Sequence, residues 1–169
     1  MKLFKNQKGF TLIELLVVIG ILAVLLAITL IAINPARQFS QANNTKRSSD
    51  VNAILNAVNQ YMADHKGALP ASLNGCIAAT PCTITNNAAV TPGVDLCTTL
   101  VSSYLAALPV DPLTNNGTAV TEANCVISVG PPAIPAYNTN YQIYQSALNN
   151  RVTVLAPASE LGASISVTR

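Results

Sequence analysis

The side chains of this chain that could take part in chemistry are few, and one group of them lies within the first fourteen residues. Gly9 and Phe10 precede Thr11 and Glu14, and a long apolar run follows Glu14 directly. A carboxylate beside a membrane helix is costly unless a partner neutralises it, so Glu14 is a candidate functional residue. Thr11 and Glu14 also match the S/T-x-x-E spacing of a capping box, in which two side chains satisfy free amides where a helix begins. The residues alone leave both roles open.

The cysteines form a second group, and all four follow the apolar run: Cys76, Cys82, Cys97 and Cys125. Their gaps of 5, 14 and 27 residues contain no C-x-x-C pair, unlike common zinc sites. An even number of cysteines in a small segment rich in Thr, Asn and Pro indicates disulfides and an oxidising, extracytoplasmic compartment. Of the three pairings that four cysteines allow, we expect Cys76–Cys82 as a local loop and Cys97–Cys125 as a link from helix to strand.

The sequence lacks the residue patterns of common enzyme active sites. The chain has one histidine and no tryptophan, and it contains no G-x-S-x-G, H-E-x-x-H or Walker pattern. Cysteines paired in disulfides cannot act as nucleophiles, and His65 is expected at a solvated helix end. We therefore predict no enzymatic activity and no bound cofactor.

Charge is scarce and nearly balanced. Only 9% of the residues are charged, against about 25% in average chains. The net charge is +2, and outside the first nine residues, which hold three lysines, six basic side chains stand against seven acidic ones. This balance excludes an ordinary basic nucleic-acid binder, so no direct contact with nucleic acid is expected.

The apolar run predicts a membrane helix. Residues 15–36 carry no charge, and about 20 apolar residues span the hydrocarbon core of a bilayer. The alternative is a secretory signal peptide, but its apolar core has only about 7–15 residues, and Asn34-Pro35-Ala36 is a poor cleavage site. Basic residues on both sides of the run balance, so charge does not orient the helix. The cysteines do orient it, and they place the downstream segment outside the cytoplasm.

The segment Lys8-Gly9-Phe10-Thr11-Leu12-Ile13-Glu14-Leu15-Leu16 resembles the class III leader junction of type IV pilins and pseudopilins. The common features are the leader glycine, the phenylalanine after it, the glutamate at the fifth mature position and the immediate apolar helix. The resemblance implies that a membrane aspartyl peptidase cleaves between Gly9 and Phe10 and methylates the new amino terminus of Phe10. It also implies that Glu14 neutralises this amino group in an adjacent subunit during assembly, which avoids two unpaired charges in an apolar bundle.

A second helical pattern follows the apolar run. Apolar residues at 51, 54, 55, 58, 61 and 62 form one stripe of an amphipathic helix that Gly67 closes. This helix either continues the membrane helix as one spine or forms separately after a break at Asn34-Pro35, because Pro35 removes a backbone hydrogen bond. The predicted division is a cleaved leader 1–9, a transmembrane and filament-core helix 10–36, its amphipathic continuation 37–67 and a globular head 68–169.

The expected fold class is α+β and pilin-like, with the long N-terminal helix packed on a small antiparallel sheet. In the head, apolar residues that repeat at four predict a helix over 95–108, and Pro-rich residues 130–135 predict an extended loop. Leu148-Asn149-Asn150 is typical of the turn of an antiparallel hairpin. The predicted strands are 125–129, 140–145, 151–156 and 164–167.

The stretch Leu108-Pro109-Val110-Asp111-Pro112 resembles a segment of the major pseudopilins of type II secretion, some of which bind calcium in the later loop. The resemblance makes Asp111, Asn115 and Glu122 candidate oxygen ligands. The alternative, which these residue types favour, is a Pro/Asp turn with solvated carboxylates.

Together these features predict a structural subunit of the major pilin kind that polymerises through its N-terminal helix into a type IV pilus-like surface filament. The alternatives are a pseudopilin of a type II secretion or DNA-uptake machine, and a single-pass anchored extracytoplasmic binding domain that does not polymerise. The expected partners are copies of the same chain, the prepilin peptidase, an inner-membrane platform and an assembly ATPase. The precursor is expected in the inner membrane with its head outside the cytoplasm, and the mature form in an extracellular filament.

Overall fold

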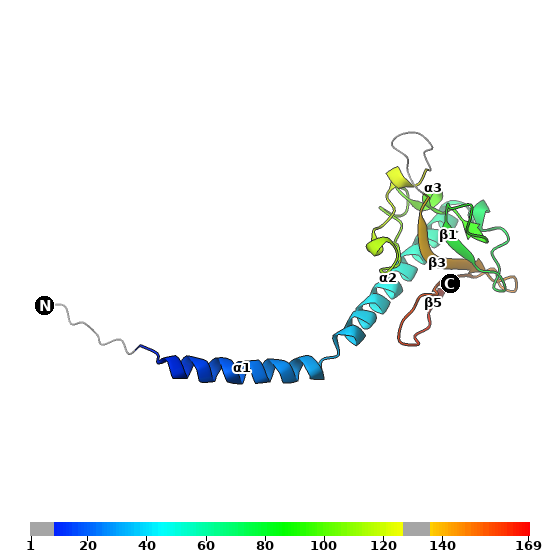
Figure 1. Ribbon diagram of the computed structural model, residues 1–169. Coiled ribbons are helices and arrows are strands. Elements are labelled where there is room, and N and C mark those ends of the chain that lie inside the picture. The colour runs from blue at the N-terminus through cyan, green and yellow to red at the C-terminus, as the bar shows by residue number, and fades with distance from the viewer. Residues whose placement is uncertain (1–8, 127–135) are drawn as a thin grey trace. The chain divides into compact units, whose positions relative to one another are not determined.

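The computed structural model describes residues 9–126 and 136–169. The chain divides into an N-terminal unit that ends at Phe39 and a second unit, Ser40–Arg169. Helix α1 (Leu12–Ala32) makes up most of the first unit. The second unit contains the larger part of helix α2 (Pro35–Asp64) together with the strands (Figure 1).

Helix α1 is apolar on every side. None of its 21 residues is buried, and each of its large apolar side chains is more than half exposed. A helix with this composition needs an apolar surrounding, either a membrane or a protein core. Within the described residues, α1 is the one helix that is long and apolar enough to cross a membrane.

The two helices are separated at Ile33 and Asn34. Proline disfavours helical backbone in the residue before it and cannot donate to the preceding turn. Pro35 instead takes the first position of α2, where its missing N–H costs nothing, and the Asn34 side chain accepts a hydrogen bond from the Arg37 amide at 3.3 Å. The expected continuation of the membrane helix into residues 37–67 as one spine is therefore wrong, and the structure has the alternative, a break at Asn34-Pro35.

Helix α2 packs one face into the core of the head. The predicted stripe is confirmed, because Val51, Ile54, Leu55 and Val58 have no solvent exposure. The chain leaves the helix at Gly67, whose φ is +86° and whose amide donates to the Met62 carbonyl at 2.7 Å.

The sheet of the head has five strands in the order β2-β1-β3-β4-β5. It is mixed rather than purely antiparallel, because the short β2 runs parallel to β1 while the other pairs are antiparallel. The α+β, pilin-like layout is confirmed, and so is the β3–β4 hairpin around residues 147–150. The strands are β1 (Cys82–Thr85), β2 (Gly93–Val94), β3 (Asn138–Gln145), β4 (Val152–Ala156) and β5 (Ile165–Thr168).

The predicted head helix over 95–108 is wrong. Only one turn forms, α3 (Cys97–Leu100). It ends at Val101, whose backbone is extended, and the left-handed Ser102 (φ +68°) follows. Leu96, Leu100 and Leu108 are all fully buried, so their spacing reflects core contacts of an irregular segment and not a helix. The remaining short turns are 3-10 helices η1 (Ala71–Leu73), η2 (Asn115–Gly117) and η3 (Glu122–Asn124).

The predicted strand over 125–129 is wrong where it can be compared. Cys125 has helical backbone angles and ends η3, and Val126 lies in a bend. Residues 127–129 and the predicted loop 130–135 lie outside the described residues. Sequence patterns missed β1 and β2, since two to four residues are too few for an alternation to stand out.

Two disulfides close the loops of the head. Cys76 is bonded to Cys82 across a separation of six residues, and Cys97 to Cys125 across 28. This is the pairing that the spacing favours, although the longer bridge joins α3 to the end of η3 and not to a strand. Both bridges tie irregular segments to the core, since all four cysteines are buried.

The longer disulfide should contribute more stability than the shorter one. Replacing Cys97 and Cys125 by serine is expected to lower the free energy of unfolding by about 3.5 kcal/mol, and replacing Cys76 and Cys82 by about 2 kcal/mol, because the longer loop loses more entropy when closed. Urea unfolding of the full chain in detergent micelles measures this, with tyrosine fluorescence as the readout, since all five tyrosines lie in the second unit. A larger loss for the short loop would contradict the prediction.

Candidate functional site

The N-terminal junction forms a compact cap on α1. The Glu14 amide donates to Thr11 Oγ1 at 3.3 Å, and the Thr11 amide and hydroxyl donate to Glu14 Oε2 at 3.1 and 2.9 Å. The predicted capping box is therefore confirmed. Its geometry holds the Glu14 carboxylate at the first turn of the helix, four residues from Phe10.

The bond that precedes this cap is open to an approaching enzyme. Phe10 is 82% exposed, and the space around the Cα of Gly9 is empty, with no atom within 4 Å of the position where a Cβ would stand.

Residues 4–30 match the family model described as the prokaryotic N-terminal methylation motif. The chain carries the class III signal segment of type IV pilins and pseudopilins. No curated protein and no solved structure matches the chain. The motif ends within α1, so the comparisons do not cover the head. Its role in this pilin-like precursor has to be inferred from its structure.

The motif has general consequences for this precursor. It implies association with a membrane and processing by a prepilin peptidase and assembly machinery. Helix α1 begins inside the matched residues and is long and apolar enough to cross a membrane.

A buried ion cluster lies in the head of the precursor, on the side of α2. Arg47 has no solvent exposure, and its Nε and Nη2 donate to Asp111 Oδ2 and Oδ1 at 2.6 and 3.2 Å. Its Nη1 donates to Glu160 Oε2 at 2.8 Å and to Asn44 Oδ1 at 3.0 Å. These bonds, with Asp111 first, hold the pKa of Arg47 above its usual range, so the guanidinium stays charged.

Sequence reasoning missed Arg47, which it counted only as one more basic residue after the apolar run. A signal was present, because position 47 continues the apolar stripe of α2 four residues before Val51. A cation on the buried face of a helix needs a buried anion. Nothing in the local pattern says which carboxylate that is.

The solvated turn expected at Asp111 is wrong, because Asp111 has no solvent exposure and both of its oxygens are engaged. Its Oδ1 also accepts the amide of Leu113 at 2.9 Å, so the turn is present but buried. The other two calcium candidates lie apart in the chain, Asn115 at the start of η2 and Glu122 at the start of η3. Within residues 9–126 and 136–169 no three His, Cys, Asp or Glu side chains cluster as metal ligands.

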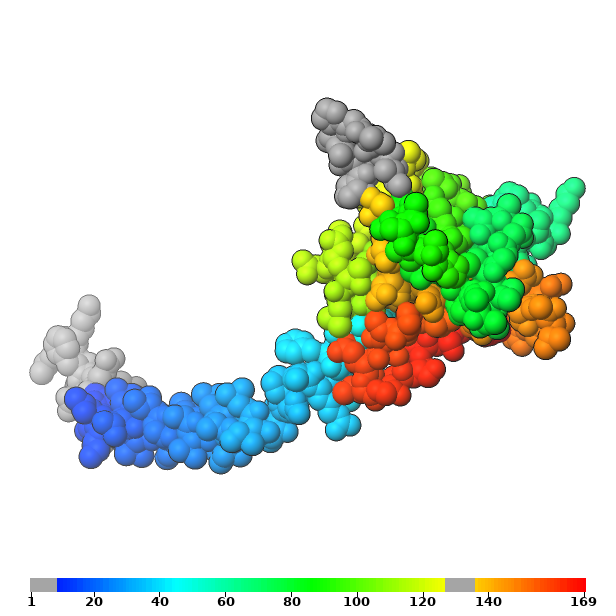
Figure 2. All heavy atoms as spheres, turned by 45° about the vertical axis from the view of Figure 1, so that its right-hand side comes forward, coloured from blue at the N-terminus to red at the C-terminus, as the bar shows by residue number. Residues whose placement is uncertain are grey.

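Glu160 connects the β4–β5 loop to α2 through five hydrogen bonds, the one from Arg47 included, here called the Glu160 clasp. Its carboxylate accepts from Ser40 Oγ and Asn43 Nδ2, both at 2.9 Å, in addition to Arg47. Its carbonyl accepts from Asn44 Nδ2 at 2.8 Å, and its amide donates to Asn44 Oδ1 at 2.9 Å. Figure 2 shows the orange-red C-terminal segment lying against the light-blue part of α2 where this clasp forms.

Two buried tyrosines complete the polar interior. The Tyr141 hydroxyl donates to Asp50 at 2.8 Å, and the Tyr137 hydroxyl donates to Asp95 at 2.6 Å. Burial first, and then the neighbouring carboxylate, raises the pKa of each phenol far above its usual range. Both phenols therefore stay neutral donors. Tyr141 ties β3 to α2, and Tyr137 ties the segment before β3 to the one before α3.

Breaking the Arg47 cluster should destabilise the head strongly. Arg47→Met is expected to lower the free energy of unfolding by about 3–5 kcal/mol, because it leaves the Asp111 carboxylate buried without a cation. Adding Asp111→Asn in the same chain should recover part of that loss. Urea unfolding of the full chain in micelles measures both, with the exposed Arg37→Met as the control that changes little. A double variant no more stable than Arg47→Met would contradict the pairing.

The Glu160 clasp should make the stability of the head depend on pH. Hydrogen bonds from Asn43, Arg47 and Ser40 lower the pKa of Glu160 below its usual range. The stabilisation is therefore complete above the unfolded-state pKa of about 4.3 and is lost as the pH falls through the lower folded-state pKa. We expect Glu160→Gln to lose less stability than wild type between about pH 5 and about pH 3.

The measurement is the urea midpoint of the full chain across that pH range. Glu122→Gln serves as the matched control, because Glu122 is exposed on the head. Its profile should follow that of the wild type. If the Glu160→Gln profile also overlays the wild type, the clasp does not carry the acid sensitivity.

Proposed function

We propose that this protein is the precursor of a structural subunit that is cleaved between Gly9 and Phe10, methylated at the amino terminus of Phe10, and polymerised through α1 into a type IV pilus-like surface filament. The observation that carries the proposal is the methylation motif at residues 4–30, which includes most of α1, a helix whose apolar surface is entirely unburied. That surface requires a membrane before assembly and the helices of neighbouring subunits after it.

The capping box supports the role of Glu14 in assembly. In the precursor the carboxylate accepts hydrogen bonds from the amide and the hydroxyl of Thr11. Cleavage creates an ammonium group at Phe10, four residues away. In an apolar bundle of α1 helices, an unpaired charge costs free energy. The Glu14 carboxylate of one subunit and the Phe10 ammonium of its neighbour avoid this cost when they pair. Helices packed in another register would leave both groups unpaired.

The structure of the head is suited to a position on the outside of the filament, around the bundle of α1 helices. It has its own core, two disulfides and few charges, so it needs no help from α1 to fold. The partners of this function are further copies of the chain, the prepilin peptidase, an inner-membrane platform and an assembly ATPase. The precursor is placed in the inner membrane with its head outside the cytoplasm, where the disulfides form.

A pseudopilin of a secretion or DNA-uptake machine is the second candidate, since the same motif serves both kinds of subunit. It differs in forming a short filament and not a long surface fibre. A single-pass anchored binding domain is the third, and it differs in keeping residues 1–9 and in having no use for Glu14.

Processing and assembly can be separated by intact mass. Wild-type protein in fibres sheared from the surface of the native host is expected to begin at Phe10 and to carry one methyl group and two disulfides. Gly9→Val should remain uncleaved in the membrane, because a branched side chain obstructs the scissile bond. Glu14→Ala should be cleaved and methylated but absent from the fibres, because the Phe10 ammonium then has no partner.

Glu122→Ala is the matched control, since it removes an exposed carboxylate from the head and should leave fibres intact. A chain that begins at Met1 and stays in the membrane in wild type and Glu14→Ala alike would overturn the proposal and leave the anchored domain. Processed protein that never enters sheared fibres, in wild type as in the variant, would instead favour the pseudopilin.

A further inference from the structure

The sheet of the head has one face that the core does not use. Side chains alternate along each strand, and Tyr141, Ile143, Val152 and Val154 point into the core with α2. The alternate residues form the outer face of β3, β4 and β5. The strand register places cross-strand partners side by side on this face: Tyr144 lies opposite Thr153, and Leu155 lies opposite Ser166. The residues of this outer face are Gln142, Tyr144, Thr153, Leu155, Ser166 and Thr168.

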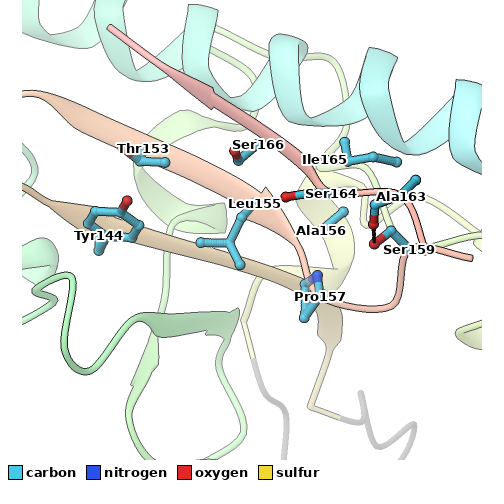
Figure 3. Close-up of a pocket in the computed structure, with 10 residues that line it drawn as sticks. All are labelled: Tyr144, Thr153, Leu155, Ala156, Pro157, Ser159, Ala163, Ser164, Ile165 and Ser166. Atoms are coloured by element: carbon cyan, nitrogen blue, oxygen red, sulfur yellow. Dashed lines mark hydrogen bonds between the residues drawn. The ribbon is translucent and has the colours of Figure 1, made fainter.

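A hollow of about 350 Å³ lies on this outer face, between the strands and the β4–β5 loop. Its size falls at the lower end of the usual range for ligand pockets, about 300–1,000 Å³. None of the ten residues that line it is charged. Figure 3 shows Tyr144 on β3 near Thr153 and Leu155 on β4, with Ser166 of β5 beside them.

The polar side-chain groups of the hollow are hydroxyls, and some of them are held by hydrogen bonds within the head. Thr153 Oγ1 and Thr168 Oγ1 share a hydrogen bond of 2.8 Å across β4 and β5. The Ser159 hydroxyl donates to the Ala163 carbonyl and closes the rim of the loop (Figure 3). The hydroxyls of Tyr144, Ser164 and Ser166 make no hydrogen bond within the described residues, so they can serve a ligand.

The chemistry of the lining selects one class of ligand. An anion would need a cation, and a cation would need a carboxylate, and the lining offers neither. A fully apolar ligand would cover the free hydroxyls without replacing their bonds to water, which costs free energy. The ring of Tyr144 and the side chain of Leu155 nevertheless offer an apolar platform between these hydroxyls. A neutral ligand with an apolar ring face and a rim of hydroxyls satisfies all of these conditions.

We propose that the outer face of β3, β4 and β5 binds a neutral saccharide. The C–H face of a pyranose ring packs on Tyr144 and Leu155, and its ring hydroxyls exchange hydrogen bonds with Ser164 and Ser166. The site belongs to the head alone, so it works in a single chain and does not depend on polymerisation. It would let a filament built from this subunit adhere to a neutral polysaccharide.

The test is retention of the full chain, in detergent micelles, on insoluble neutral polysaccharides: cellulose, chitin and amylose. Two further matrices are tested in the same way: beads coated with alginate, an anionic polysaccharide, and beads coated with the chain itself. We expect retention on at least one neutral matrix, a loss of about tenfold in affinity for Tyr144→Ala, and nearly full affinity for Tyr144→Phe, which keeps the ring.

Two further variants keep the result interpretable. Ser166→Lys places a charge in the hollow on an exposed edge-strand residue, which the fold tolerates, and it should weaken binding as much as Tyr144→Ala. Tyr104→Ala is the matched control, because Tyr104 is also half-buried but packs against Tyr61 at the end of α2, and it should bind like wild type. A urea midpoint near that of the wild type shows that each variant is folded.

Several results would overturn the proposal. One is the lack of retention on all three neutral matrices. Another is equal retention of wild type, Tyr144→Ala and Ser166→Lys. Stronger retention on alginate would show a charged ligand, and retention only on beads that carry the chain itself would show that the face is a contact between copies.

Discussion

A guanidinium without solvent exposure stands where α2 meets the irregular half of the head, and its charge must be balanced inside the protein. Arg47 is bonded to Asp111 through two nitrogens and to Glu160 through a third. A buried charge is tolerated only with near-complete pairing, so the segments that carry the two carboxylates have to be where they are. One side chain thereby positions a loop 64 residues away and another 113 residues away.

This constraint matters because regular structure is scarce in the head. The described strands have between two and eight residues, and the segment from the end of α3 to residue 126 is mostly turns and bends. Local side-chain bonds supply order there. In five places among the described residues of the head, an Asn or Asp side chain accepts the amide two residues further on, which satisfies backbone groups in the turns. The five residues are Asn87, Asp95, Asp111, Asn138 and Asn149.

The two units of the chain are stabilised in different ways. The N-terminal unit presents an apolar helix with no buried residue, so its stability and its role come from what surrounds it. The second unit closes its own core, pairs its ions and bonds its cysteines. This division suits the proposed function, in which only the first unit changes its surroundings when a subunit moves from a membrane into a polymer. The uncharged outer face of the sheet is left free for contacts of the head.

The sequence by itself determined the features that depend on near neighbours. The cap at Thr11 and Glu14, the break at Pro35, the buried stripe of α2 and the β3–β4 hairpin follow from spacings of two to four residues. Only the tertiary structure decided that Asp111 is the buried partner of Arg47, that Glu160 clasps α2, and that the leucines around α3 belong to an irregular core. Local patterns record the backbone's own preferences, whereas these contacts form only when distant segments close on one core and exclude water from it.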